Sequence, residues 1–314
     1  MTEYPIRMGI VGFGKIAQDQ HVPSIAGEPR YVLAAVSSSR NVELPGVPRF
    51  NGHHAMLSGM EGRLDAVALC MPPVARQVVA LDCLQAGLHV LLEKPPALTL
   101  AEISELRASA MENGVVVFGT WHSRFNASVE TAAGWLNGKP VRAVWIDWLE
   151  DVRKWHPGQE WIWEESGFGV FDPGINALSI LTRLLPGQID VIDAELFVPS
   201  NRSMPIAATL SLKSDDVEQA IAVKLDWRET REECWTIRIE MTDGDVVELR
   251  GGGSEFVVNG EVAARNENRE YPGLYSHFAD IVASGGSDLD ARPLAIVLDA
   301  FARGRKTSVD AFES

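Results

Sequence analysis

The feature that most constrains the fold of this chain is a glycine-rich turn, GFGKIA, at residues 12–17. The turn directly follows the apolar run Arg7–Val11, and a helical pattern begins at about Ile16. Strand, turn and helix therefore occur in the order that the dinucleotide-binding pattern G-x-G-x-x-G/A requires. An ordinary glycine turn would also fit these six residues alone, but their surroundings favour a dinucleotide site.

Each residue of the turn suits that role. Gly12 permits a tight turn, Gly14 lets a pyrophosphate approach the backbone, and Ala17 lets the helix pack closely on the sheet. We expect Lys15 and Ile16 to contribute to cofactor binding, because the first N–H groups of a helix attract phosphate.

Apolar runs alternate with helical patterns through the first 120 residues, which predicts a parallel sheet covered by helices on both faces. The predicted strands are Arg7–Val11, Tyr31–Val36, Ala66–Met71, His89–Leu92 and Val115–Phe118, and the later helices are Val74–Ala86 and Ala101–Asn113.

The pattern changes near residue 120, after which strand-like runs follow one another on short turns and predict a mostly antiparallel sheet. We therefore expect an α/β chain with a Rossmann domain at 1–120 and a substrate domain at 121–314, whose C-terminal helix can pack back on the first domain. The predicted strands are Val141–Trp148, Val191–Val198, Ala207–Leu212, Gln219–Trp227, Trp235–Met241, Val246–Leu249 and Glu255–Val258; the helices are Val129–Leu136, Asn176–Leu185, Leu274–Ala283 and Leu294–Gly304, with an irregular stretch at Trp155–Gly169.

Composition excludes several classes of function. The 28 basic and 43 acidic residues give a net charge of −15, which argues against binding to nucleic acid or to an anionic membrane. Three cysteines without metal-ligand spacing predict no metal site and a reducing compartment. We read neither a signal peptide nor a membrane-spanning run, so we expect a cytoplasmic location.

The end of the second predicted strand bears on the choice of cofactor. NAD sites usually carry an acid there for the ribose 2′-hydroxyl, whereas this chain has Ser37, Ser38, Ser39 and Arg40. Hydroxyls and a guanidinium suit a 2′-phosphate, so the stretch favours NADP, or use of both NADP and NAD. An ordinary solvated loop explains it about equally well.

A second motif, Glu93-Lys94-Pro95, follows the strand His89–Leu92. Ligands of open α/β sheets bind beyond the carboxyl ends of the strands, which places Glu93 and Lys94 where cofactor and substrate meet. An ammonium group there can bind a substrate hydroxyl, and a lowered pKa would let it act as a base. A surface lysine beside a rigid turn is the alternative.

The glycine turn together with Glu93-Lys94-Pro95 resembles the glucose–fructose oxidoreductase/inositol dehydrogenase (Gfo/Idh/MocA) family over nearly the whole chain. The resemblance implies a Rossmann domain followed by a domain with an open-faced, mostly antiparallel sheet. Within the family, the segments at 120–124, 150–158 and 169–176 are similar to bacterial aldose 1-dehydrogenases that act on D-galactose or L-arabinose. The family resemblance also suggests a homodimer that forms through the open face of this sheet.

The resemblance implies that Lys94, Asp172 and Asn176 surround the reacting hydroxyl of an aldose. Asp172 and Asn176 are four residues apart, so on a helix they project from one face. Many relatives have a histidine acid/base at the position of Asn176, which cannot take up a proton. Either Lys94 or Asp172 must then be the base. An N-cap is the alternative role for Asp172.

The remaining sugar contacts are expected from carboxylate, imidazole and indole groups, which combine fixed polar atoms with a flat apolar surface. Core packing is the alternative for any tryptophan, and we expect it for Trp135 and Trp145. The predicted sugar-binding residues are His122, Glu150, Trp155, His156, Asp172, Asn176 and Trp235.

These observations predict an NAD(P)-dependent enzyme that oxidises the anomeric carbon of galactose or arabinose to a 1,5-lactone without a metal. The alternatives are an oxidoreductase for another polyol, such as an inositol dehydrogenase, and a non-catalytic protein that senses the redox state of the dinucleotide. A structural module would not need the glycine turn.

Overall fold

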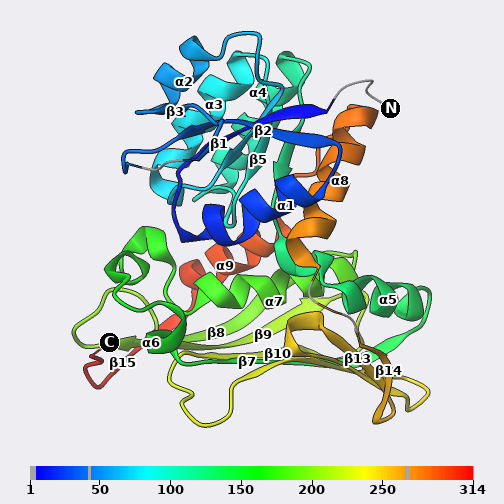
Figure 1. The fold of residues 1–314 in the computed structure, drawn as a ribbon. Coiled ribbons are helices and arrows are strands. Elements are labelled where there is room, and N and C mark those ends of the chain that lie inside the picture. Colours follow the sequence, from blue (N-terminus) through cyan, green and yellow to red (C-terminus); the bar gives the residue numbers. More distant parts are fainter. Residues whose placement is uncertain (1–4, 42–43, 266, 268, 314) are drawn as a thin grey trace. The chain divides into compact units, whose positions relative to one another are not determined.

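The structure is a computed structural model that describes residues 5–41, 44–265, 267 and 269–313. The chain forms two compact units (Figure 1): the first comprises Met1–His122 and Glu270–Ala291, and the second comprises Ser123–Arg269 and Arg292–Ser314. The predicted domain boundary at 120/121 stays a prediction. Helix α8, Glu270–Ser284, belongs to the first unit although it follows the second sheet in the sequence. The last helix of the chain, α9 at Arg292–Arg303, belongs to the second unit.

The first unit contains a six-stranded parallel sheet in the order β3-β2-β1-β4-β5-β6. This order is that of a Rossmann fold and confirms the predicted parallel sheet. The central strands are almost wholly buried, as expected when helices cover both faces. The strands are β1 Ile6–Val11, β2 Tyr31–Ser37, β3 Arg49–Phe50, β4 Ala66–Leu69, β5 His89–Leu92 and β6 Val117–Gly119.

The helix after the glycine turn is already helical at residues 15–16, contains a π-helical segment, Ala17–His21, and continues as α1, Val22–Gly27. Pro23 lacks the N–H group that a regular helical ladder would use, and it stands where the pattern changes. The other helices of the unit are α2 His53–Gly59, α3 Arg76–Gln85, α4 Leu100–Glu112 and α8 Glu270–Ser284. The predictions did not include β3 or α2.

The second unit contains a nine-stranded sheet in the order β14-β13-β12-β11-β7-β10-β9-β8-β15. Its strands pair antiparallel except for β7 with β10 and β8 with β15, so the predicted mostly antiparallel sheet is confirmed. The strands are β7 Val141–Leu149, β8 Ile189–Pro199, β9 Ala207–Ser214, β10 Ile221–Asp226, β11 Cys234–Met241, β12 Val246–Arg250, β13 Glu255–Val258, β14 Glu261–Arg265 and β15 Arg305–Val309.

Three helices cover one face of this sheet: α5 Ala127–Leu136, α7 Phe171–Leu184 and α9 Arg292–Arg303 (Figure 1). Strand β7 alternates buried with exposed residues because its other face is not covered by these helices. Trp145 lies on that open face with 38% of its surface exposed, so its predicted core position is wrong. Trp135 is half-buried and packs against Phe256.

Helix α7 begins at Phe171, five residues before the predicted start. The start was predicted too late because Pro173 and Gly174 usually interrupt helices, although both are tolerated in a first helical turn. Gly174 also allows close packing, because a Cβ there would lie 2.5 Å from Leu225 of β10. The irregular stretch before α7 contains the short helix α6, Val152–Trp155, and two 3₁₀ turns.

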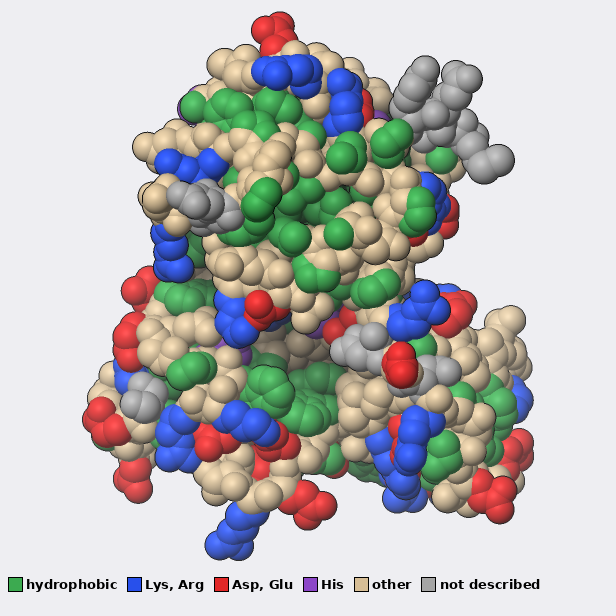
Figure 2. Space-filling model, in the orientation of Figure 1, with side chains coloured by type: hydrophobic (Ala, Val, Ile, Leu, Met, Phe, Trp, Pro, Cys, Tyr) green, Lys and Arg blue, Asp and Glu red, His purple; other side chains and the backbone are tan. Residues whose placement is uncertain are grey.

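Acidic and basic side chains are interspersed over the face drawn in Figure 2, so the net charge of −15 does not gather there into one acidic patch. Among the described residues, none of the helices combines the length and apolar character that crossing a membrane requires.

Candidate active site

The glycine turn has the geometry that a dinucleotide requires. Gly12 has φ +88°, and a Cβ there would lie 2.7 Å from the backbone nitrogen of Met71, so the position needs glycine. Around Gly14 the space is open, since a Cβ there would meet no described atom within 4 Å. The protein itself does not require Gly14, whereas a pyrophosphate lying against the backbone would.

Replacing Gly14 by alanine separates these two requirements. We expect Gly14→Ala to fold normally and to bind NAD(P) at least about tenfold more weakly, because the methyl group occupies space that the pyrophosphate needs. Fluorescence titration with the cofactor measures the effect. Gly27→Ala is the matched control, because its Cβ also meets open space and lies outside the turn. Equal affinity in both variants would contradict the assigned role of Gly14.

The end of β2 forms an ordered turn. The hydroxyl of Ser38 accepts the N–H of Arg40 at 3.1 Å, and Arg49 of β3 donates to the carbonyls of Ser38 and Arg40 at 3.2 Å each. Ser37 and Ser38 are buried, whereas Arg40 is exposed. The predictions missed Arg49, which brings a second guanidinium to this turn.

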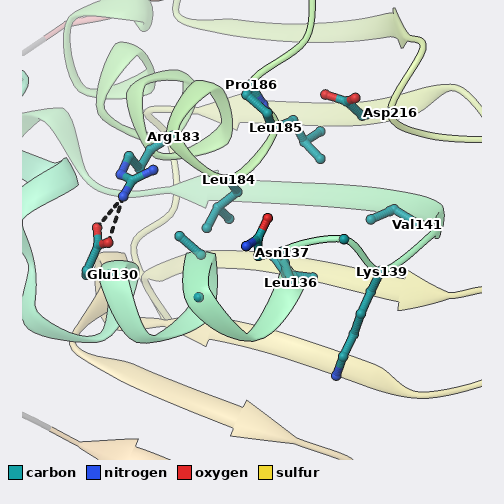
Figure 3. A pocket seen from close by; sticks show the side chains of 13 residues that line it. Glu130, Leu136, Asn137, Lys139, Val141, Arg183, Leu184, Leu185, Pro186 and Asp216 are labelled. Atoms are coloured by element: carbon teal, nitrogen blue, oxygen red, sulfur yellow. Dashed lines mark hydrogen bonds and ion pairs between the residues drawn. The ribbon is translucent and has the colours of Figure 1, made fainter.

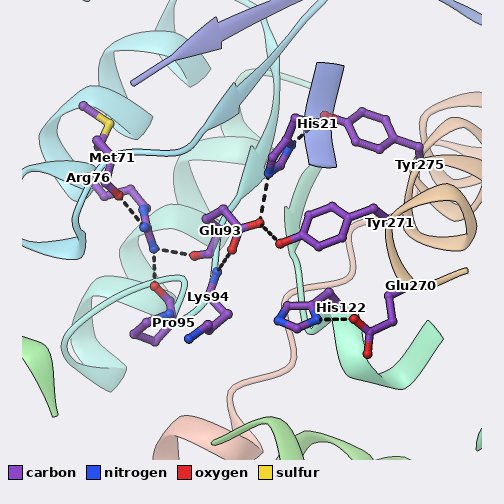
Figure 4. Close-up of polar contacts among 10 residues, drawn as sticks. All are labelled: His21, Met71, Arg76, Glu93, Lys94, Pro95, His122, Glu270, Tyr271 and Tyr275. Atoms are coloured by element: carbon purple, nitrogen blue, oxygen red, sulfur yellow. Dashed lines mark hydrogen bonds and ion pairs between the residues drawn. The ribbon is translucent and has the colours of Figure 1, made fainter. Parts of the chain in front are cut away.

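A buried polar cluster surrounds Glu93 (Figure 4). Its carboxylate accepts the hydroxyl of Tyr271 at 2.7 Å and the backbone N–H of Lys94 at 2.9 Å. His21 Nε2 lies 2.9 Å from the same carboxylate, and its Nδ1 lies 2.8 Å from the hydroxyl of Tyr275. We call His21, Glu93, Tyr271 and Tyr275 the Glu93 cluster. All four side chains are buried and belong to the first unit.

Charge pairing dominates the titration of this cluster. Burial opposes the charged forms of both Glu93 and His21. Contact with His21 and Tyr271 nevertheless lowers the pKa of Glu93, and contact with Cys70 and Glu93 raises the pKa of His21. Burial and the neighbouring carboxylate raise the pKa of Tyr271, which keeps it a hydrogen-bond donor. The cluster is therefore an ion pair held by neutral phenols.

Lys94 lies two residues beyond the carboxyl end of β5 and is half-buried. Arg76 donates to the backbone carbonyls of Glu93 and Pro95, and the Lys94–Pro95 peptide bond is cis (Figure 4). Side-chain contacts thus hold the backbone on both sides of Lys94. His122 also lies in the first unit, where its Nδ1 is 3.0 Å from Glu270 and its ring stacks on Tyr271.

In the second unit a buried carboxylate lies between two indoles. Glu150 follows β7 directly, and its oxygens accept Nε1–H of Trp235 at 2.8 Å and of Trp227 at 3.2 Å. Trp227 follows β10, and because β7 and β10 are parallel, their carboxyl ends meet at one edge of the sheet. The predictions missed Trp227, since the sequence does not reveal this parallel pairing.

Asp172 and His156 lie close together, and His156 lies beside Trp227. His156 Nε2 is 3.6 Å from Asp172 Oδ2, and the His156 ring lies 5.4 Å from that of Trp227. Asp172 is in the first turn of α7, but the N-cap is Val170 and no side chain caps the helix. The N-cap alternative for Asp172 is therefore wrong. Asn176 lies one turn further along α7 and is half-buried.

Trp155 and Trp235 meet edge to face with ring centroids 5.7 Å apart. Glu233 fixes the Trp155 side of this pair, because it accepts Nε1–H of Trp155 at 2.6 Å and pairs with Lys154. The structure thus brings Glu150, Trp155, His156, Asp172 and Trp235 together in the second unit. It places Lys94 and His122 in the first unit, and the roles of all seven residues remain predictions.

A separate open cavity of about 460 Å³ lies between the ends of α5 and α7 (Figure 3). Its lining includes Leu136, Lys139, Leu184 and Asp216, and Arg183 pairs with Glu130 at its rim. The cavity contains none of the predicted site residues, so we assign it no part in the chemistry.

A parallel sheet in this order, with a glycine turn after its first strand, defines a dinucleotide-binding protein. Residues 6–120 match the model of the oxidoreductase family with an NAD-binding Rossmann fold, Gfo/Idh/MocA. The chain is 41% identical to galactose 1-dehydrogenase of Pseudomonas fluorescens over 312 residues, covering 98% of this chain and 99% of that protein. The chain belongs to this family of NAD(P)-dependent oxidoreductases, as the resemblance implied.

Solved structures agree with this placement. D-galactose-1-dehydrogenase from Rhizobium etli superimposes with a TM-score of 0.95 at 42% identity and covers 100% of this chain and 99% of its own. A 3-ketoreductase from Actinomadura kijaniata superimposes with a TM-score of 0.83 at 18% identity over 97% of this chain and 99% of its own, which shows a common fold alone.

Proposed function

We propose that the protein is an aldose 1-dehydrogenase that oxidises D-galactose at C1 to the 1,5-lactone. The observation that carries the proposal is the buried Glu150 carboxylate between the indole N–H groups of Trp227 and Trp235. The Trp227 ring in turn lies beside His156, which is 3.6 Å from Asp172. Such a set supplies the fixed polar atoms and flat walls that a pyranose needs. The near full-length similarity to two proteins named as galactose 1-dehydrogenases supports galactose as the sugar. L-Arabinose is the second candidate.

Gly12 and Gly14, with the N–H groups that begin the following helix, are the residues that would hold the dinucleotide phosphates. When bound, the nicotinamide supplies the acceptor for the hydride that leaves C1. We propose NADP, or both cofactors, because Arg40 and Arg49 can pair with a 2′-phosphate and β2 ends without an acid.

The chain's own task is to remove the proton from the C1 hydroxyl as the C1–H bond breaks. Lys94 and Asp172 are the candidate bases, and either would end the step carrying that proton. Asn176 would orient the hydroxyl without titrating. His156 Nε2 lies 3.6 Å from Asp172 Oδ2, so His156 can hold the Asp172 carboxyl group in position.

Glu150 is expected to bind sugar hydroxyls away from C1. Glu150→Gln removes a charged acceptor, so we expect KM for galactose to rise roughly 10- to 100-fold, the usual worth of a hydrogen bond to a charged group. We expect kcat to change little, because the group does not act at the reacting bond. Steady-state kinetics with Glu248→Gln, on β12 of the same sheet, as control test this. A fall in kcat at unchanged KM would place Glu150 in the chemistry instead.

The proposed activity is tested by initial rates of nicotinamide reduction with NADP and with NAD, each against D-galactose, L-arabinose, D-glucose, D-xylose and myo-inositol. We expect the highest kcat/KM with galactose. Turnover confined to myo-inositol would make the protein an inositol dehydrogenase. Cofactor binding without turnover on any substrate would favour a redox sensor.

We also propose a homodimer through the open face of the nine-stranded sheet. This face carries Trp145, over which Arg238 lies at 5.7 Å, and an exposed tryptophan of this kind is typical of interfaces. Light scattering of the purified protein measures the mass, and Trp145→Lys should shift a dimer towards monomer.

A further inference from the structure

We propose that His53, His54 and Asp82 form a surface site for a divalent transition metal of the zinc type. Their potential ligand atoms all lie within 4.8 Å of one another. Among the described parts of the chain, this is the group of histidine, cysteine and acidic side chains that could hold an ion. The three residues belong to the first unit and lie outside the predicted cofactor and sugar residues.

The local structure aims both imidazoles at one carboxylate. His53 begins α2 after Gly52, whose φ is +96°. Neighbouring helical residues normally point in different directions, yet these two rings lie with centroids 3.9 Å apart. Asp82 is on α3, where the adjacent Cys83 is fully buried and fixes that turn of the helix. A bound ion would therefore link α2 to α3.

The distances between the histidine nitrogens and the Asp82 carboxylate are compatible with one ion bound by all three side chains. His53 Nε2 lies 2.7 Å from Asp82 Oδ2, and His54 Nε2 lies 3.7 Å from the same oxygen. Two ligands bound to one tetrahedral zinc at about 2.0–2.1 Å lie about 3.3 Å apart, between these two values. Small side-chain rotations suffice to place an ion among the three groups.

The donor set and its exposure favour a transition metal. Imidazole with carboxylate suits Zn²⁺, Ni²⁺ and Cu²⁺, whereas Mg²⁺ and Ca²⁺ prefer oxygen ligands. His54 is 77% exposed and Asp82 29% exposed, which leaves room for water in the remaining coordination positions. A direct hydrogen bond between His53 and Asp82 would explain the 2.7 Å distance between them. It would not explain why His54 also lies close to the same carboxylate oxygen.

Zinc titration of the full-length protein by calorimetry at pH 7.5, after treatment with a chelator, tests the site. We expect saturable binding of one Zn²⁺ that millimolar Mg²⁺ does not displace. His54→Ala should weaken it at least about tenfold, because even loss of an outer partner costs a metal site about 10–100-fold. His54 is exposed, so this variant should fold. Asp82→Asn should act in the same direction.

His277→Ala is the matched control, since His277 also pairs with an aspartate, Asp288 at 3.0 Å, in the same unit. Zinc should raise the thermal midpoint of the wild type and of His277→Ala, but not that of His54→Ala. No saturable zinc binding, unchanged binding in His54→Ala, or an equal loss in His277→Ala would overturn the proposal. These readouts do not depend on sugar turnover.

Discussion

Replacing Lys94 by alanine is expected to lower kcat for galactose oxidation by about 10²–10⁴-fold, the usual contribution of a general acid or base. Lys94 is the candidate base that the first unit supplies, and Arg76 and Glu93 hold the backbone around it. Because the variant removes one half-buried side chain, we expect the thermal midpoint to stay close to the wild type. Lys213→Ala, on β9, serves as the control.

Two further variants decide between the candidate bases. Lys94→Arg keeps the positive charge but cannot give up its proton, so it should be as inactive as Lys94→Ala if Lys94 is the base. If Asp172 is the base, Lys94→Arg should recover part of the activity and Asp172→Asn should be the more damaging change. Near-normal turnover in Lys94→Ala would remove Lys94 from the mechanism.

Replacing His21 by leucine is expected to destabilise the protein by about 3–5 kcal/mol, because it leaves the buried carboxylate of Glu93 without its cation. The midpoint of urea unfolding measures the loss. His277→Leu is the control, since its partly exposed pair with Asp288 should contribute at most about 1 kcal/mol. Equal losses in the two variants would show that burial of the His21–Glu93 pair confers no special stability.

The effect of His21→Leu should also depend on pH. Although burial favours the neutral ring, Cys70 and Glu93 raise the pKa of His21 from 6.5 to about 10, so its contribution is complete below pH 6.5 and is lost as the pH rises through about 10. Burial likewise opposes the charged carboxylate, but His21 and Tyr271 lower the pKa of Glu93 from 4.5 to about 2. Its contribution is complete above pH 4.5 and is lost as the pH falls through about 2. The difference from the wild type should therefore be largest between pH 4.5 and 6.5. A constant difference from pH 5.5 to 9.5 would contradict this assignment.

Periodicity predicted most of the fold because its elements are buried on at least one face. Strand β5 was predicted with its observed ends, His89–Leu92, since both faces are covered and every residue but the first is buried. Strands β14 and β15 were not predicted, because their residues are mostly exposed and carry no apolar alternation. Trp145 was assigned to the core because the sequence does not show which face of a sheet lacks a cover.

The positions of several candidate residues in the fold were predictable, because Lys94 and Glu150 follow strands and Asp172 and Asn176 lie one helical turn apart. Their roles stay predictions. The Glu93 cluster was not predictable, since Glu93 and Tyr271 are 178 residues apart and His21 and Tyr275 are 254 apart. Contacts at such separations leave no local pattern. The group of His53, His54 and Asp82 was not predicted either, because Asp82 lies 29 residues after His53 in the sequence.

The discontinuity of the first unit has a consequence for synthesis on the ribosome. All six strands of its sheet are complete by residue 119, yet the hydroxyls of Tyr271 and Tyr275 that join the Glu93 cluster lie on α8. During synthesis, the buried ion pair of the first unit therefore lacks these two hydrogen-bond partners until strands β7 to β14 of the other sheet have been translated. We expect a fragment that stops at residue 122 to bind cofactor poorly, and added α8 peptide to restore it.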